Sequence, residues 1–111
     1  MPDLLNQGII FFNAQKYFEA HEVWEDLWRE TTGVERLFYQ GLIQAAVGFH
    51  HLSRGNRSGA RSQLTKSLGK LARYPADCAG IDAESLIEDV RKTLETLDDP
   101  AFRAIRIARL K

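Results

Sequence analysis

Cysteine is almost absent from this chain, which contains only Cys78. A single cysteine excludes an internal disulfide framework and a zinc site built mainly from cysteine. The scarcity of cysteine fits a reducing compartment, and we therefore expect a cytoplasmic protein.

Long apolar runs are also missing, and no basic N-terminal stretch leads into an apolar one. Both absences favour a protein without a membrane-spanning helix or a secretory signal. Strand-like alternation of apolar and polar residues is scarce, whereas helix-forming residues dominate. Since about a hundred residues support one hydrophobic core, we expect a single all-α domain over residues 1–111.

Neither charge is in excess, because the chain has 15 basic and 15 acidic residues. A net charge near zero predicts no polyanionic partner. The charges are unevenly distributed, since residues 1–35 contain seven acidic and two basic residues, and residues 36–73 contain seven basic and no acidic ones. Aromatic residues do not interleave with the basic stretch, which argues against nucleic-acid binding. A solvated basic face, or one paired with the acidic segment, is the simpler interpretation.

Apolar spacing predicts a bundle of about five or six helices. Asn56 and Asp82 are the expected N-caps of the fourth and fifth helices. Asp99 followed by Pro100 predicts a last short helix. The predicted helices cover approximately residues 3–14, 17–31, 35–53, 57–73, 83–97 and 100–110.

The first half of the chain contains a weak internal repeat. A shift of forty positions places Gly8 on Gly48 and Ala20 on Ala60, with a short turn at the same place in both copies. Two copies do not make a solenoid, but they predict two packed helical hairpins followed by C-terminal helices. Gly41 and Gly48 weaken the third helix, and we expect another helix to approach closely there.

Polar residues interrupt the apolar faces of the second and third helices. His21, Glu25 and Trp28 lie at positions i, i+4 and i+7 and project from one face of the second helix. The third helix is apolar nearly all round, and its polar exceptions lie within about 40° of one another. These exceptions are Gln40, Gln44 and His51. Polar side chains on facing apolar surfaces are either paired or line a cavity.

This pattern allows three kinds of chemistry. His21 and Glu25 could hold a divalent metal, with His51 or a glutamine carbonyl as a further ligand. His21 oriented by Glu25 could act as a general base, although no nucleophile stands out beside it. Alternatively, Glu25 with Gln40 and Gln44 could form a buried hydrogen-bond network that only fixes how the two helices pack.

Three segments resemble a known family when they are taken in order. They are FFNAQKYFEAHEVWEDLWR, then FYQGLIQAAVGFHHLSRGN with GA after it, and a GID in the last third. Over about residues 10–97 the chain resembles the bacterial and archaeal family of uncharacterised proteins called DUF309. The resemblance implies a compact all-α fold and an H-x-x-x-E-x-x-W signature, here His21, Glu25 and Trp28. It also implies possible metal binding through that signature, but no established activity.

The sequence therefore predicts a site for a small polar ligand or a divalent metal between the second and third helices. Its expected residues are His21, Glu25, Trp28, Gln40, Gln44 and His51. The alternative is a helical scaffold that binds another protein or a second copy of itself, with the same polar residues serving only the fold.

Overall fold

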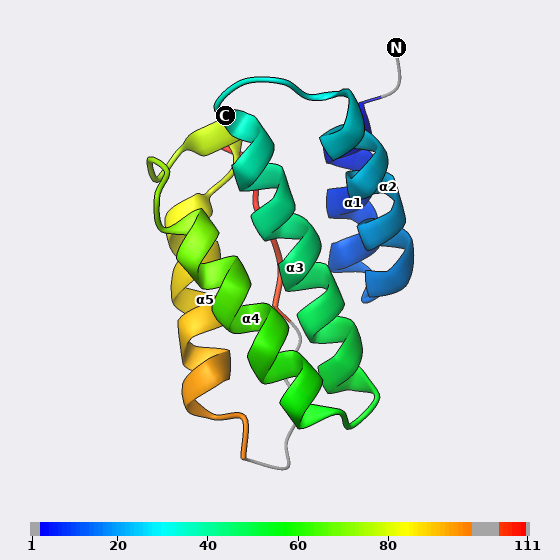
Figure 1. Ribbon diagram of the computed structural model, residues 1–111, viewed down its shortest axis with the longest axis vertical. Helices are drawn as coiled ribbons and strands as arrows, with labels where there is room; N and C mark the ends of the chain where they lie inside the picture. Colours follow the sequence, from blue (N-terminus) through cyan, green and yellow to red (C-terminus); the bar gives the residue numbers. More distant parts are fainter. Residues whose placement is uncertain (1–2, 99–104, 111) are drawn as a thin grey trace.

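The computed structural model describes residues 3–98 and 105–110, and within these ranges the fold is all-α (Figure 1). This confirms the predicted fold class. The helices are α1 (Leu4–Asn13), α2 (Tyr17–Glu30), α3 (Glu35–Ser53), α4 (Arg57–Leu71) and α5 (Ala83–Glu95), with a 3-10 turn, η1, at Cys78–Gly80. No helix of the described part is long and apolar enough to cross a membrane.

Both predicted N-caps are confirmed by side-chain hydrogen bonds. Asn56 accepts from the backbone N–H of Gly59 at 3.0 Å, and Asp82 accepts from that of Ser85 at 3.0 Å. Each bond satisfies one of the N–H groups that the first turn of a helix leaves without a partner. The two caps fix where α4 and α5 begin.

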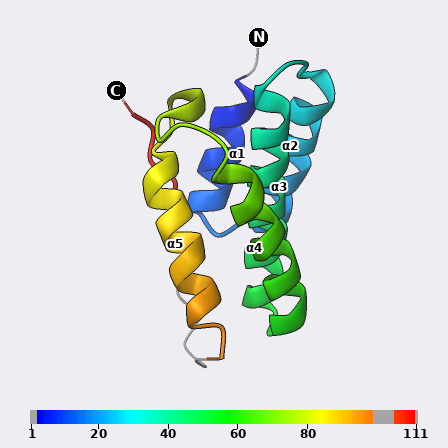
Figure 2. The ribbon, with the colours of Figure 1, turned by 60° about the vertical axis from the view of Figure 1, so that its left-hand side comes forward.

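Helix α3 lies at the centre of the bundle, between the α1–α2 hairpin and the α4–α5 pair (Figures 1 and 2). Its core residues Phe38, Leu42 and Phe49 are fully buried. A helix contacted on both sides needs apolar residues around most of its surface, as the sequence of α3 has.

The α1–α2 hairpin and the α3–α4 hairpin repeat each other in the turn that joins their helices. Lys16 donates its backbone N–H to the carbonyl of Phe11 at 2.8 Å, and forty positions on Asn56 donates to the carbonyl of His51 at the same distance. The predicted forty-residue repeat is therefore present in the backbone.

The glycines of the repeat also match. A methyl group added to Gly8 would overlap the ring of Trp24, and one added to Gly48 would collide with Leu64. The two contacts are again forty residues apart. The close approach expected at Gly41 is confirmed as well, since Ser67 of α4 donates a hydrogen bond to its carbonyl at 2.7 Å.

The prediction of a helix over residues 100–110 is wrong in the part that the structure describes. Residues 105–110 are extended instead, and Arg109 forms an isolated antiparallel bridge with Ile81. Residues 99–104 lie outside the described ranges. We call residues 105–110 the C-terminal strap. Ile107 is buried while Arg106 and Ala108 are exposed, which is the period-two pattern of extended chain rather than the helical period.

Hydrogen bonds from distant parts of the chain replace those of a helix in the strap. The Asn13 side chain donates to the carbonyl of Ile107 at 2.9 Å and accepts from its N–H at 2.7 Å. Further along, Asp82 donates its N–H to the carbonyl of Ala108 at 2.8 Å. These tertiary partners outweigh the local helical preference.

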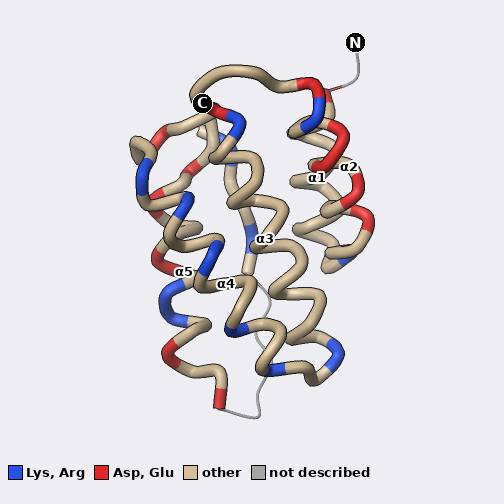
Figure 3. The backbone as a smooth tube through the Cα atoms, in the orientation of Figure 1, with Lys and Arg blue, Asp and Glu red and all other residues tan. Residues whose placement is uncertain are grey.

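The acidic residues of α2 and the basic residues of α4 lie on opposite sides of α3 (Figure 3). Among the described residues no ion pair joins α2 to α4. Arg61 of α4 instead lies 3.6 Å from Asp98, and Lys70 donates to the side chain of Gln44. The basic face of α4 is therefore not paired with the acidic helix, and the interpretation that remains is a largely solvated face.

Candidate functional site

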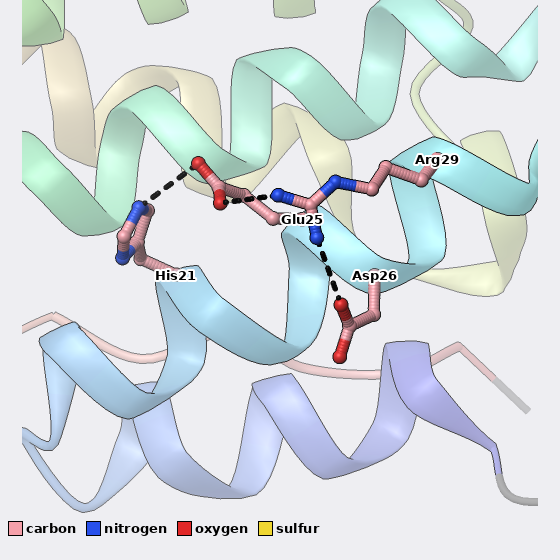
Figure 4. A network of polar contacts seen from close by, with 4 residues as sticks. All are labelled: His21, Glu25, Asp26 and Arg29. Carbon is pink, nitrogen blue, oxygen red and sulfur yellow. Dashed lines mark hydrogen bonds and ion pairs between the residues drawn. The ribbon is translucent and has the colours of Figure 1, made fainter.

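The site begins with a pair of side chains one turn apart on α2. His21 Nε2 lies 3.1 Å from Glu25 Oε1, and the two side chains are 22% and 37% exposed. A carboxylate can only accept, so the imidazole donates through this nitrogen. Figure 4 shows the pair on α2, and both residues line a hollow shared with α3.

The second oxygen of Glu25 is also in use. Arg29 Nη2 lies 3.4 Å from Glu25 Oε2, and its Nη1 lies 3.2 Å from Asp26 Oδ1 (Figure 4). The charge of Glu25 is thus balanced within its own helix, with a hydrogen bond on each oxygen.

A hollow of about 310 Å³ opens beside this pair, and we call it the polar hollow. It is bounded by α2, α3 and α4. Five of the six site residues expected from the sequence line it. The full lining is His21, Glu25, Trp28, Gln40, Ile43, Gln44, Val47 and Gln63.

His51, the sixth expected residue, does not line the polar hollow. It belongs to the neighbouring cavity at the last turns of α3, and its Nδ1 lies 3.3 Å from the side-chain nitrogen of Asn56. The helical wheel placed His51 on the same side of α3 as Gln40 and Gln44. His51 follows Gln40 by eleven residues, however, and this spacing carries its side chain about 16 Å along the helix axis. Direction alone therefore did not place His51 in the hollow.

Gln63 is the lining residue that sequence reasoning missed. It lies on α4 seven positions before Lys70, which makes the two neighbours on one helical face. Lys70 reaches α3, where its Nζ lies 2.9 Å from Gln44 Oε1. The spacing of seven between Gln63 and Lys70 is a weak signal in the sequence. It indicates that Gln63 belongs to the site only once α4 is known to pack on α3.

The Lys70 contact also fixes the orientation of the Gln44 amide. An ammonium group only donates, so the oxygen of Gln44 must face it. The NH₂ group of Gln44 is then left to donate to another partner. Gln44 therefore contributes hydrogen-bond donors to the site.

Trp28 forms an aromatic wall of the hollow and is half-buried. Arg36, in the first turn of α3, places its Cζ 3.8 Å from the centre of the Trp28 ring. This cation–π contact holds the indole from one side.

A metal site is not shown in the part of the chain that the structure describes. Among the described residues no group of three or more His, Cys, Asp and Glu side chains comes close enough to hold one. Both oxygens of Glu25 are hydrogen-bonded, and the guanidinium of Arg29 beside them would repel a cation.

The buried network considered as the alternative is not formed among the described residues. The hydrogen bonds of Glu25 go to His21 and Arg29 of its own helix, and that of Gln44 goes to α4. None of them joins the α2 pair to a glutamine of α3. The polar side chains of the three helices line the same hollow.

The residues that line the polar hollow give only limited support for catalysis. His21 is oriented by Glu25, as a general base would be. The lining residues include no serine, threonine or cysteine that could act as a nucleophile beside it. The arrangement is suited to hydrogen-bond recognition.

Fold and site together define a small all-helical protein with a polar hollow between its central helices. The chain belongs to the family described as "Domain of unknown function (DUF309)", whose model matches residues 5–63. The matched range contains every residue that lines the polar hollow.

Two curated relatives are similar to this chain over most of its length. An uncharacterized protein of Aquifex aeolicus (strain VF5) is 27% identical over 105 residues, which cover 91% of this chain and 32% of the relative. The uncharacterized protein YpuF of Bacillus subtilis (strain 168) is 32% identical over 99 residues, which cover 86% and 57%. The chain therefore spans about a third and somewhat more than half of these two longer relatives.

Proposed function

We propose that the polar hollow binds a small, uncharged organic molecule that both donates and accepts hydrogen bonds. One observation carries the proposal: polar side chains from three helices meet in a single hollow within a largely apolar interface. They are His21, Glu25, Gln40, Gln44 and Gln63. The volume of about 310 Å³ lies at the lower end of the range for small-molecule pockets.

The charges around the hollow favour an uncharged ligand. Glu25 is paired with Arg29, and Lys70, which donates to Gln44, is not among the residues that line the hollow. Three glutamine amides offer both donors and acceptors, and Trp28 adds a flat apolar wall. A planar amide or a nucleobase-like ring has this combination of groups.

A purely structural role accounts less well for the exposure of the pair. A buried carboxylate that fixed helix packing would cost about 1–3 kcal/mol when removed, because its donors would be left unpaired. The Glu25 side chain is 37% exposed, and exposed ion pairs contribute only about 0–1 kcal/mol. We therefore expect Glu25→Gln to leave the free energy of unfolding nearly unchanged.

Uracil is a suitable first probe, because it is small, uncharged and planar, with donors and acceptors on its edge. In an NMR titration we expect uracil to shift the side-chain amide signals of Gln40, Gln44 and Gln63. We expect Glu25→Gln to weaken binding about tenfold, because a charged acceptor is replaced by a neutral one.

Asp26→Asn is the matched control, since Asp26 also pairs with Arg29 but does not line the hollow. It removes the same charge and should leave uracil binding unchanged. Equal losses in both variants would show that only net charge matters. Glutamine signals that do not respond to uracil, acetamide or glucose would contradict the proposal.

The scaffold alternative has weaker support. Within residues 3–98 and 105–110, the large apolar side chains that are well exposed are Ile10, Phe18, Val34 and Leu110, and they come from four different segments. Single exposed apolar residues are usual on monomeric proteins. Light scattering that gave the mass of a dimer at micromolar concentration would revive this alternative.

A further inference from the structure

Lys70 lies outside the polar hollow but contacts one of the side chains that line it. Its Nζ lies 2.9 Å from Gln44 Oε1, and this contact is partly buried. Gln44 lines the hollow and Lys70 does not. Because an ammonium group only donates, the amide of Gln44 keeps its oxygen turned towards α4. A residue outside the hollow therefore sets the orientation of a residue that lines it.

The approach of Lys70 to α3 is built into the packing of the two helices. A methyl group added to Gly41 would lie 3.3 Å from Lys70 Cβ and 2.9 Å from Leu71 Cδ2, so a glycine here lets this part of α4 come close. Ser67 donates to the carbonyl of Gly41 at 2.7 Å and joins the two helices at the same place. Gln44 follows Gly41 by three residues, about one turn further along the same face. The base of the Lys70 side chain is therefore held beside α3, within reach of Gln44.

The amide nitrogen of Gln44 is free to donate, and it is accessible. Gln44 is half-buried, and among the described residues its side-chain hydrogen bond is the one from Lys70 to its oxygen. Within residues 3–98 and 105–110, the Tyr17 hydroxyl is the buried side-chain group that lacks a partner. The unpaired nitrogen of Gln44 is thus not enclosed. It has access to solvent on the side of the amide that is turned away from Lys70.

Gln44 differs in this respect from the other two glutamines of the hollow. Of the three, Gln44 is the one whose side chain is hydrogen-bonded to a described residue. The amides of Gln40 and Gln63 can turn to present either their oxygen or their nitrogen. A ligand can therefore meet Gln40 or Gln63 with a donor or with an acceptor. Gln44 accepts no such choice while Lys70 holds its oxygen.

We propose that Lys70 is a positioning residue that makes the polar hollow selective for a ligand with a hydrogen-bond acceptor beside Gln44. The ammonium holds the Gln44 oxygen, the NH₂ group is presented to the hollow, and the ligand pairs with it through a carbonyl oxygen or a ring nitrogen that carries no hydrogen. This inference rests on the proposed function of the hollow. It adds which group of the ligand is recognised at Gln44 and which residue determines that choice.

Benzoxazole and indole separate an acceptor on the ligand from a donor. They are planar, uncharged and similar in size and shape, but the ring nitrogen of benzoxazole only accepts, whereas the N–H of indole only donates. NMR titration of the side-chain amide signals of Gln44 gives a Kd for each. We expect the wild type to bind benzoxazole about fivefold more tightly than indole, because the Gln44 NH₂ group pairs with an acceptor. The ratio of the two Kd values is then compared between variants.

Lys70→Glu should reverse this preference. A carboxylate only accepts, so it should draw the NH₂ group of Gln44 towards α4 and turn the oxygen to the hollow. The variant should then bind indole more tightly than benzoxazole, and the Gln44 amide protons should move downfield even without a ligand. Lys70→Met, which offers Gln44 no strong hydrogen bond, should bind the two probes with similar affinity.

Lys70→Arg and Lys66→Glu are the controls. Arginine only donates, as lysine does, and should keep the preference for benzoxazole. Lys66 is exposed on the same helix and does not line the hollow, so Lys66→Glu makes the same change in charge outside the site. It should leave the ratio of the two Kd values at that of the wild type. A loss of helix packing alone would weaken both probes together and would not reverse their order.

The proposal is overturned if the wild type binds the two probes equally, if Lys70→Glu leaves their order unchanged, or if Lys66→Glu reverses it as well. Uracil separates such a result from a failure of the proposed function. If uracil shifts the glutamine signals while the ratio does not depend on Lys70, the hollow binds ligands but Lys70 does not determine their polarity. If neither uracil nor either probe binds, the proposed function fails, and the selectivity assigned to Lys70 fails with it.

Discussion

Gly8 lets α1 and α2 approach closely, because the indole of Trp24 fills the space that a side chain at position 8 would need. Trp24 is fully buried, and its Nε1 donates to the carbonyl of Leu5 at 3.2 Å. It cannot move aside cheaply. We expect Gly8→Ala to lower the free energy of unfolding by about 1–3 kcal/mol, as overpacking of a core does.

Gly69→Ala is the control for this substitution. Gly69 lies inside α4, and nothing lies within 4 Å of the methyl group that alanine would add. Alanine there should raise the free energy of unfolding by about 0.5–1 kcal/mol through helix propensity alone. Urea denaturation of both variants gives the comparison, and a stabilised Gly8→Ala would contradict the close packing of Trp24.

Residue spacing predicted much of the candidate site, but not all of it. His21 and Glu25 share a helical face, and this follows directly from their spacing of four. Gln63 was missed because its role depends on the way α4 packs on α3, which the sequence does not state.

At the scale of elements, the turn between α1 and α2 can be compared by substitution with its equivalent between α3 and α4. Gln15 and Gly55 occupy equivalent positions with φ of 63° and 77°. Glycine adopts such angles readily, whereas a residue with a Cβ atom is strained there.

We therefore expect Gln15→Gly to raise the free energy of unfolding by about 1 kcal/mol, and Gly55→Gln to lower it by a similar amount. Thermal unfolding followed by circular dichroism measures both changes. Changes of the same sign would mean that the two turns are not equivalent.

The extent of each helix was largely predictable, but the strap was not. Apolar periodicity and N-caps are local signals, and they placed α3 at Glu35–Ser53, where the structure has it. The extended form of residues 105–110 depends on Asn13 and Asp82, which lie far away along the chain. Local helix signals cannot report such contacts.

At the scale of the whole molecule, His50 links stability to pH. Burial lowers its pKa in the folded protein, so below about pH 6.5 the unfolded chain binds more protons than the folded one. The contribution of a neutral His50 is therefore complete above that pH and is lost as the pH falls through the folded pKa. We expect the Tm to fall between pH 7.5 and 5.5.

His50→Gln should reduce this fall in Tm, because the substituted side chain does not titrate. Differential scanning calorimetry at the two pH values compares the variant with the wild type. If both lose the same number of degrees, protonation elsewhere accounts for the acid sensitivity, and His50 does not couple pH to folding.

The C-terminal strap lies beside the start of α1. Arg109 Nη1 lies 3.3 Å from Asp3 Oδ2, so the first and last parts of the described chain are in contact. Domains whose two ends lie near each other tolerate insertion into a surface loop of another protein. We therefore expect the described bundle to keep its helix packing, and with it the polar hollow, when it is inserted into such a loop.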